Sequence, residues 1–254
     1  MNRIPQDIHI PSYMTDWAER LKPVSFMELA QEIAQHGADC LGFGHDPMAE
    51  HGATWVLSRM HIIFEKMPKW KDDVRFETWH KALNGLLVLR DFEMLDAGRN
   101  VLVSATSSWL IMDVAERRLC RPDRFSGLIP TEPQCPGDAI KEPAPKIVLP
   151  KDAEPELIRE HSVHYSDVDF IGHANNTRYI EWAMDCLPEE LLYSQPLKEL
   201  VVNYNAEVHR GETVQLYRAE LPSAETESSA QEGRRFIVEG RCNGRSSFIT
   251  EFMF

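Results

Sequence analysis

Several chain-wide patterns are missing from this sequence of 254 residues. Its five cysteines form no CxxC pair, which argues against both a disulfide framework and a structural zinc site. Charge-free stretches such as Asn100–Met112 are shorter than the roughly 18 apolar residues that a membrane span needs. The segment Met1–Pro23 carries charges along its length and offers no apolar signal-peptide core. We therefore expect a cytoplasmic protein without a membrane span.

Positive charge is also scarce. Lysine and arginine together number 27 against 40 aspartates and glutamates, so the formal net charge is -13. Phosphate backbones and anionic membranes repel a chain of this charge, and we expect no nucleic-acid partner. The hydrophobic fraction of 43% is ordinary for a globular protein, so the chain is expected to fold.

Several familiar catalytic motifs are absent as well. The chain contains no GxSxG nucleophile elbow, no GxxxxGK[ST] phosphate loop and no HExxH zinc helix. The run Gly42-Phe43-Gly44 lacks the rest of a dinucleotide fingerprint. His161 and His164 are three residues apart, a spacing that places side chains on opposite faces of a strand. We expect no metal site from this pair, and no metal or cofactor elsewhere.

Proline is concentrated in one stretch. Six of the 16 prolines lie within Ser126–Pro150. Because proline removes an amide donor and restricts the preceding residue, this stretch is expected to be an extended linker. It divides the chain into an N-terminal domain over 1–130, a linker over 131–152 and a C-terminal domain over 153–254.

The two halves of the chain show the same order of elements, which indicates an internal repeat. At an offset of 153 residues, Asp16 falls on Asp169. At an offset of 140 residues, Phe64 falls on Tyr204. The change of offset predicts an insertion of 13 residues in the first half, around 36–52.

Each half is predicted to contain one helix followed by four antiparallel strands. In the second half, apolar residues at helical spacing predict a helix from a cap at Asn175 or Asn176 to Leu187, just before Pro188. Strand composition and turn residues predict eight strands, at Ser58–Phe64, Val74–His80, Leu86–Leu95, Val101–Met112, Leu200–Val208, Thr213–Glu220, Arg234–Cys242 and Ser246–Phe254. This order predicts an α+β fold rather than alternating βα units.

One segment, residues 165–182, combines side chains that handle protons. It leaves a strand through Asp167 and Asp169, turns at a glycine and presents His173 before the helix. A carboxylate and an imidazole can move protons, and a helix N-terminus suits an oxygen that gains negative charge. The same residues also fit a purely structural role as helix caps. The pattern alone leaves both explanations open.

The run DVDFIGHANNTRYIEW (167–182) is similar to the active-site segment of hot dog fold thioesterases. Three further blocks, at Thr54–Trp79, Ala105–Leu119 and Leu200–Val214, follow the same family in the same order. Nearly the whole chain resembles the acyl-acyl carrier protein thioesterase family of plants and bacteria. The resemblance implies two tandem hot dog domains, each a long helix wrapped by an antiparallel β-sheet. It also implies hydrolysis of fatty acyl thioesters on acyl carrier protein, in fatty acid biosynthesis.

The resemblance assigns the family's catalytic residues to Asp169, His173 and Glu207. Many plant members have an Asn two residues after the Asp, where this chain has Ile171. Many members have a Cys directly after the Glu, where this chain has Val208. An amide and a thiol at these positions therefore take no part here.

The first half lacks most of this catalytic set. In the registers above, Arg20 and Met67 stand where the second half has His173 and Glu207. We therefore expect one active site per chain, in the second domain. The first domain is expected to contribute surface for the acyl chain.

The expected chemistry has two versions. In the first, Glu207 or Asp169 acts as general base, His173 assists, and backbone amides at Gly172–Ala174 stabilise the oxyanion. In the second, a carboxylate attacks the thioester and water resolves the mixed anhydride. The sequence does not choose between them.

The expected partner is an acyl carrier protein that carries a fatty acyl thioester, and a homodimer is left open. Two basic clusters are candidates for docking the carrier, and solvated charges at strand ends explain them equally well. They are Arg117, Arg118, Arg121 and Arg124, and Lys66, Lys69 and Lys71. An acyl-CoA thioesterase and a nonenzymatic acyl-thioester sensor remain the alternatives.

Overall fold

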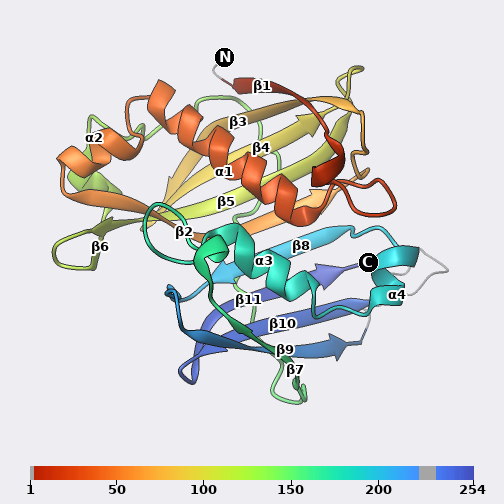
Figure 1. Cartoon of the computed structure of the whole chain (residues 1–254). Helices are drawn as coiled ribbons and strands as arrows, with labels where there is room; N and C mark the ends of the chain where they lie inside the picture. The colour runs from red at the N-terminus through yellow and green to blue at the C-terminus, as the bar shows by residue number, and fades with distance from the viewer. Residues whose placement is uncertain (1–2, 223–232) are drawn as a thin grey trace. The chain divides into compact units, whose positions relative to one another are not determined.

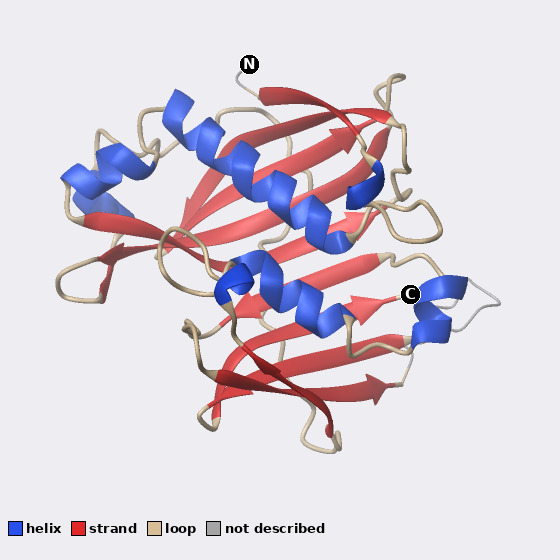
Figure 2. Cartoon of the chain, viewed as in Figure 1, coloured by secondary structure: helices blue, strands red, loops and turns tan. Residues whose placement is uncertain are grey.

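The structure, a computed structural model, describes residues 3–222 and 233–254. It divides into two units, Met1–Pro145 and Lys146–Phe254, which we call unit 1 and unit 2. In each unit a helix lies against an antiparallel sheet, and Figure 2 shows that both units contain more strand than helix.

Unit 1 is built on an antiparallel sheet in the order β1-β3-β4-β5-β2, with the short strand β6 paired to β5. Helix α1 lies across one face of this sheet (Figure 1). The elements are β1 (Ile4–His9), η1 (Ser12–Met14), α1 (Pro23–Cys40), α2 (His45–Glu50), β2 (Ala53–Phe64), β3 (Asp73–Asn84), β4 (Leu87–Leu95), β5 (Val101–Asp113), β6 (Arg118–Cys120) and η2 (Pro122–Phe125).

Unit 2 repeats this arrangement with the strand order β8-β11-β10-β9-β7, all antiparallel. This is the order of unit 1, with β7, β8, β9, β10 and β11 in place of β1, β2, β3, β4 and β5. The elements are β7 (Glu156–Ser162), η3 (Tyr165–Asp167), α3 (Asn176–Met184), α4 (Glu189–Ser194), β8 (Glu199–Tyr204), β9 (Thr213–Leu221), β10 (Arg235–Cys242) and β11 (Arg245–Met253).

The repeated order confirms the α+β fold and the internal repeat, with one main strand more per unit than the four expected. The additional strands, β1 and β7, lie at sheet edges and are largely exposed. An edge strand that faces solvent does not need alternating apolar residues. The sequence pattern therefore carried no signal for β1, and it indicated β7 only as a strand without bounds before Asp167.

Helix α1 buries a continuous apolar face against the sheet of unit 1. The ring of Phe26 lies 5.2 Å from that of Phe76 on β3, centroid to centroid. Near the helix end, a Cβ atom at Gly37 would lie 2.7 Å from the Arg90 guanidinium on β4. Glycine thus allows α1 to pass close to this strand.

Helix α3 begins as expected and ends one turn early. Asn175 is the cap, and the last helical residue is Met184 rather than Leu187. The Leu187 N–H donates to the Met184 carbonyl, three residues back, so the last turn tightens before Pro188. With nine residues against 18, α3 is half as long as α1, whereas the resemblance implies a long helix in both domains. None of the helices within residues 3–222 and 233–254 has the length and the hydropathy of a membrane span.

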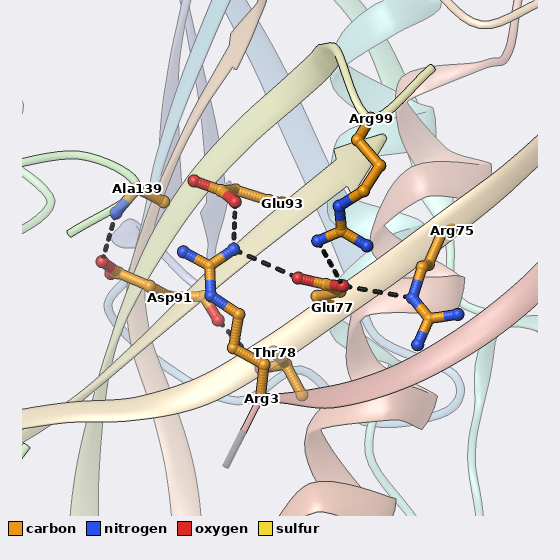
Figure 3. A network of polar contacts seen from close by, with 8 residues as sticks. All are labelled: Arg3, Arg75, Glu77, Thr78, Asp91, Glu93, Arg99 and Ala139. Carbon is orange, nitrogen blue, oxygen red and sulfur yellow. Dashed lines mark hydrogen bonds and ion pairs between the residues drawn. The ribbon is translucent and has the colours of Figure 1, made fainter. Parts of the chain in front are cut away.

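The boundary between the units falls inside the segment 131–152, which the sequence marks as a linker. Within the described chain, no helix or strand lies between η2 and β7. The segment is nevertheless held by hydrogen bonds on each side of the boundary. In unit 1 the Ala139 N–H donates to the Asp91 carboxylate at 2.8 Å (Figure 3). In unit 2 the Ile147 N–H donates to Asn203 Oδ1 at 2.8 Å.

A buried carboxylate ties the chain start to the sheet of unit 1 (Figure 3). Glu77 on β3 lies 3.1 Å from Arg3, 3.1 Å from Arg75 and 3.2 Å from Arg99. Arg3 also pairs with Glu93 on β4. Burial acts to raise the pKa of Glu77, but the hydrogen bonds from the three arginines outweigh it and lower that pKa.

Candidate active site

The segment 165–182 folds as η3, a tight loop and α3. Gly172 marks the turn of the loop with a φ of 92°, a conformation that side-chain-bearing residues rarely adopt. The Gly172 N–H donates to the Asp169 carbonyl at 3.0 Å. The Asp169 N–H donates to the His173 carbonyl at 3.1 Å. These bonds bring the backbones of Asp169 and His173 side by side.

The Asp169 carboxylate is held by its own loop and by the helix cap. Its Oδ1 accepts from the Ile171 N–H at 3.0 Å, and its Oδ2 accepts from Asn175 Nδ2 at 3.1 Å. Asn175 Oδ1 accepts from the N–H and the hydroxyl of Thr177, at 3.0 Å and 2.8 Å. The helix cap is therefore Asn175, which also orients Asp169, and Asp169 itself caps nothing in α3.

Glu207 lies in the loop between β8 and β9, because β8 ends three residues before it. The prediction of a strand through Val208 was wrong at this end. The Ala174 N–H donates to the Val208 carbonyl at 2.8 Å, and the Val208 N–H donates to the Tyr179 hydroxyl at 3.1 Å. These two bonds hold the loop against the start of α3. Glu207 Oε2 then lies 3.5 Å from His173 Nε2.

Of the three residues that the sequence singled out, the structure brings His173 and Glu207 together. Their side chains are 23% and 29% exposed, so a substrate can reach both. The Asp169 side chain contacts its own loop and the cap instead. The charges of both carboxylates affect Tyr179, a buried residue of α3. Burial raises the pKa of the Tyr179 phenol, and the charges of Glu207 and Asp169 raise it further, so the phenol stays protonated.

His209 belongs to the site and was not singled out from the sequence. Its ring meets the ring of His173 edge-on, with centroids 4.7 Å apart and planes at 82°. The backbone N–H of His209 donates to the Glu212 carboxylate at 2.7 Å. The sequence could have indicated His209 by its position, because it lies two residues after Glu207 in the block Leu200–Val214 that resembles the family.

Two of the three amides expected to stabilise an oxyanion are used by the fold. The N–H groups of Gly172 and Ala174 donate to the carbonyls of Asp169 and Val208. The expectation was therefore wrong for these two amides. These two N–H groups already donate to backbone carbonyls of the protein and are therefore not free to donate to a substrate oxygen.

A second polar cluster lies where the loop begins. His161 Nε2 is 3.0 Å from Asp167 Oδ2, which also accepts from the His164 N–H at 2.7 Å. The two histidine rings are 6.2 Å apart, although a strand was expected to send them to opposite faces. That expectation was wrong because β7 ends two residues before His164. Burial acts to raise the pKa of Asp167, but the hydrogen bonds from His164 and His161 outweigh it and lower that pKa.

Unit 1 contains the same loop with different side chains. There an isolated antiparallel bridge joins Arg20 to Lys69. In unit 2 the equivalent bridge joins His173 to His209, which confirms the offsets of 153 and 140 residues. Asp16 pairs with Arg20 at 2.8 Å. Unit 1 thus keeps the backbone of the site, with an ion pair in place of the imidazole.

Comparisons with known proteins match both units to domains of the same family. Residues 2–124 match the family model of the acyl-ACP thioesterase N-terminal domain, and residues 150–249 match that of the C-terminal domain. An oleoyl-acyl carrier protein thioesterase from Arabidopsis thaliana is 30% identical over 219 residues, which cover 77% of this chain and 57% of that protein. A palmitoyl-acyl carrier protein thioesterase from Gossypium hirsutum is 30% identical, over 68% of this chain and 43% of that protein. The chain thus spans about half the length of these two chloroplastic relatives.

Solved structures show the same fold over almost the whole chain. An acyl-ACP thioesterase from Bacteroides thetaiotaomicron has a TM-score of 0.81 at 23% identity, covering 99% of this chain and 97% of that one. The 12:0-ACP thioesterase from Umbellularia californica has a TM-score of 0.82 at 22% identity, covering 98% and 96%. These likenesses confirm the tandem hot dog fold that the resemblance implies. With both family models matched in order, the chain belongs to the acyl-ACP thioesterase family.

Proposed function

We propose that this chain hydrolyses fatty acyl thioesters of acyl carrier protein to free fatty acid and carrier protein, in fatty acid biosynthesis. The observation that carries the proposal is the approach of His173 Nε2 to Glu207 Oε2, at 3.5 Å, beside the Asp169 loop. The names of the plant relatives support the carrier-bound substrate. The ion pair of Asp16 and Arg20 in unit 1, where unit 2 has His173, supports a single site per chain. The contribution of acyl-chain surface by unit 1 is part of the proposal.

In the proposed mechanism, Glu207 takes a proton from a water molecule whose oxygen attacks the carbonyl carbon. Glu207 passes this proton to His173 Nε2, which lies 3.5 Å away. The tetrahedral intermediate then breaks the carbon–sulfur bond, and His173 delivers the proton to the leaving thiolate. We assign the base to Glu207 because its carboxylate lies beside His173 Nε2, whereas the Asp169 carboxylate is bound to its own loop and to Asn175. Asp169 then contributes negative charge in the same loop as His173.

The direct test is an assay of the purified full chain on matched thioesters. Acyl carrier protein and CoA derivatives of the same fatty acids are compared by the release of free thiol. We expect the carrier thioesters to give the higher kcat/KM. Higher kcat/KM on CoA thioesters would support an acyl-CoA thioesterase. Binding without thiol release would support a nonenzymatic sensor.

We further propose a cytoplasmic location. All five cysteines are free and four of them are buried, which supports a reducing compartment. Fractionation of the native host tests this location.

A homodimer is a further possibility that the sequence leaves open. Light scattering of the purified chain tests it, and a mass near the 29.2 kDa of one chain rejects it.

A further inference from the structure

Three side chains of unit 2 point ligand atoms at a common space. His173, Glu207 and His209 each offer one nitrogen or oxygen, and these atoms all lie within 4.8 Å of one another. We propose that these residues form a binding site for a divalent metal ion of the zinc class, which inhibits the enzyme when it is occupied. The inhibition rests on the proposed function, whereas the metal site rests on the geometry alone.

The spacing of two of the ligand atoms already fits a tetrahedral ion. Zinc binds nitrogen and oxygen at about 2.0 to 2.2 Å, which places two ligand atoms about 3.4 Å apart. His173 Nε2 and Glu207 Oε2 are 3.5 Å apart. This separation exceeds that of an ordinary hydrogen bond, about 2.7 to 3.2 Å. The two groups therefore leave room for a common ligand.

The third ligand, His209, needs only a small side-chain movement. From the outer limit of 4.8 Å, its nitrogen must approach by about 1.4 Å to reach tetrahedral spacing. Its backbone is fixed by the bridge to His173 and by the hydrogen bond to Glu212. The side chain is exposed, so its ring can turn and an ion can enter from solvent.

The donor set selects the class of ion. Two imidazole nitrogens and one carboxylate oxygen suit Zn²⁺, Co²⁺ or Cu²⁺, whereas Mg²⁺ and Ca²⁺ prefer sites made of oxygen alone. Three protein ligands leave the fourth tetrahedral position to water. In unit 1 the equivalent positions hold Arg20, Met67 and Lys69, which cannot form such a site. We therefore infer one ion per chain.

The bound ion blocks the proposed chemistry. Coordination occupies the lone pair of His173 Nε2 and an oxygen of Glu207. Neither group can then accept the proton that hydrolysis requires. The ion therefore acts as an inhibitor.

The binding test uses Co²⁺ as a visible probe on the full chain. We expect one Co²⁺ per chain, with the strong visible absorption of a tetrahedral ion, and displacement by Zn²⁺. His209→Gln removes one ligand and should weaken Co²⁺ binding at least about tenfold. His9→Gln is the matched control, because His9 is an exposed histidine of unit 1 that pairs with Asp73. It should leave Co²⁺ binding unchanged.

The inhibition test follows release of free fatty acid, because the thiol product itself binds Zn²⁺. Each rate is taken relative to the metal-free rate of the same variant. Zn²⁺ should inhibit the wild-type chain and His9→Gln at concentrations that spare His209→Gln. Equal inhibition of all three, or a rate increase with Zn²⁺, would overturn the inhibitory role.

The two proposals fail in different ways. A chain that binds Co²⁺ through His209 and hydrolyses no thioester contradicts the proposed function and leaves the metal site supported. A chain that hydrolyses carrier thioesters and shows no tetrahedral Co²⁺ spectrum contradicts the metal site alone. An unchanged Co²⁺ affinity in His209→Gln also rejects the site.

Discussion

At the scale of single residues, Asp169, His173 and Glu207 carry the proposed chemistry through different contacts. We expect Asp169→Asn, His173→Ala and Glu207→Gln each to lower kcat at least about 100-fold, because each removes a charge or a proton carrier. Steady-state assays with circular dichroism as a fold check measure this. The control is Asp16→Asn in unit 1, which should keep its turnover. A similar loss at Asp16 would indicate two working sites.

The role of the two carboxylates can be separated by isotope transfer. We expect direct attack by water, because Glu207 stands beside His173 and no thiol follows it at Val208. Single turnover in heavy-oxygen water should label the released fatty acid and leave Asp169 and Glu207 unlabelled. Mass spectrometry of both products reads the label. Heavy oxygen in either side chain would establish the mixed anhydride instead.

Asn175 is a positioning residue with two functions, capping α3 and donating a hydrogen bond to Asp169, which can be tested separately. Asn175→Ser keeps an oxygen for the Thr177 N–H and loses the amide that donates to Asp169. We expect kcat to fall about tenfold, as for one hydrogen bond to a charged group, with stability nearly unchanged. Asn175→Ala removes the cap as well and should also lower the free energy of unfolding by about 1 kcal/mol.

The neighbouring residue supplies the matched control. Asn176→Ser makes the same exchange one position later, where the hydrogen bond to Tyr204 uses the backbone carbonyl and not the side chain. It should change neither kcat nor stability. Full activity in Asn175→Ser would show that the hydrogen bond to Asp169 is dispensable.

At the scale of elements, the Glu77 network fastens the start of the chain and β4 to β3 (Figure 3). Glu77→Gln removes the charge that three arginines share. We expect the free energy of unfolding at pH 7 to fall by about 2 kcal/mol, below the usual 3 to 5 for a buried pair because the arginines reach solvent. Denaturant unfolding of the full chain measures this.

The same change should alter the pH dependence of stability. The pKa of Glu77 is lowered from 4.5, so the folded chain keeps this carboxylate charged where the unfolded chain takes up a proton. Its contribution is complete above pH 4.5 and is lost as the pH falls below that value. The difference between wild type and Glu77→Gln should therefore shrink in acid. The exposed Glu65→Gln is the control, and a constant difference would contradict the network.

The sequence predicted elements well where a buried face sets the pattern. The Asn175 cap and the strands β3, β9 and β10 were expected within a few residues, because alternating or helical apolar spacing reports burial. The edge strand β1 was missed and β7 was expected without bounds, since exposed backbone pairing leaves no such pattern. The strand β8 was predicted four residues too long, through Val208 rather than Tyr204.

The candidate site was predicted only in part, for a related reason. Asp169, His173 and Glu207 came from the resemblance, which follows motif positions. The amides of Gly172 and Ala174 were misassigned, because backbone hydrogen bonds across the loops do not appear in a sequence. His209 was missed because its partner, His173, lies 36 residues away and meets it only through the bridge between two loops.

At the scale of the whole molecule, the net charge of the chain affects its association with an acidic carrier protein. The chain carries a formal charge of -13, and acyl carrier proteins are generally strongly acidic. Long-range repulsion then requires a local basic surface at the docking site. In the arginine cluster, Arg124 pairs with Asp113 at 2.9 Å and Arg121 with Asp123 at 3.5 Å. The exposed Arg118 on β6 makes no ion pair with any residue that the structure describes.

We expect reversal of Arg117 and Arg118 to Glu to raise KM for acyl carrier protein thioesters about tenfold at low salt. The effect should fade at high salt, because rim charges act mainly on association and are screened by ions. Turnover of a short, uncharged thioester should stay the same, since no catalytic group is touched. Reversal of Lys146 and Lys151 changes the net charge equally and should leave KM unaltered.

A normal KM for the carrier substrate at low ionic strength would reject the arginine cluster as the docking surface. The same reversal at Lys66, Lys69 and Lys71 then tests the second cluster, in which Lys71 lies 4.0 Å over the ring of Trp70. An acidic carrier that used neither cluster would meet the long-range repulsion of this chain without a basic surface to offset it. An unchanged KM after reversal of both clusters would therefore favour CoA thioesters as the substrates of this chain, because CoA is not attached to an acidic protein.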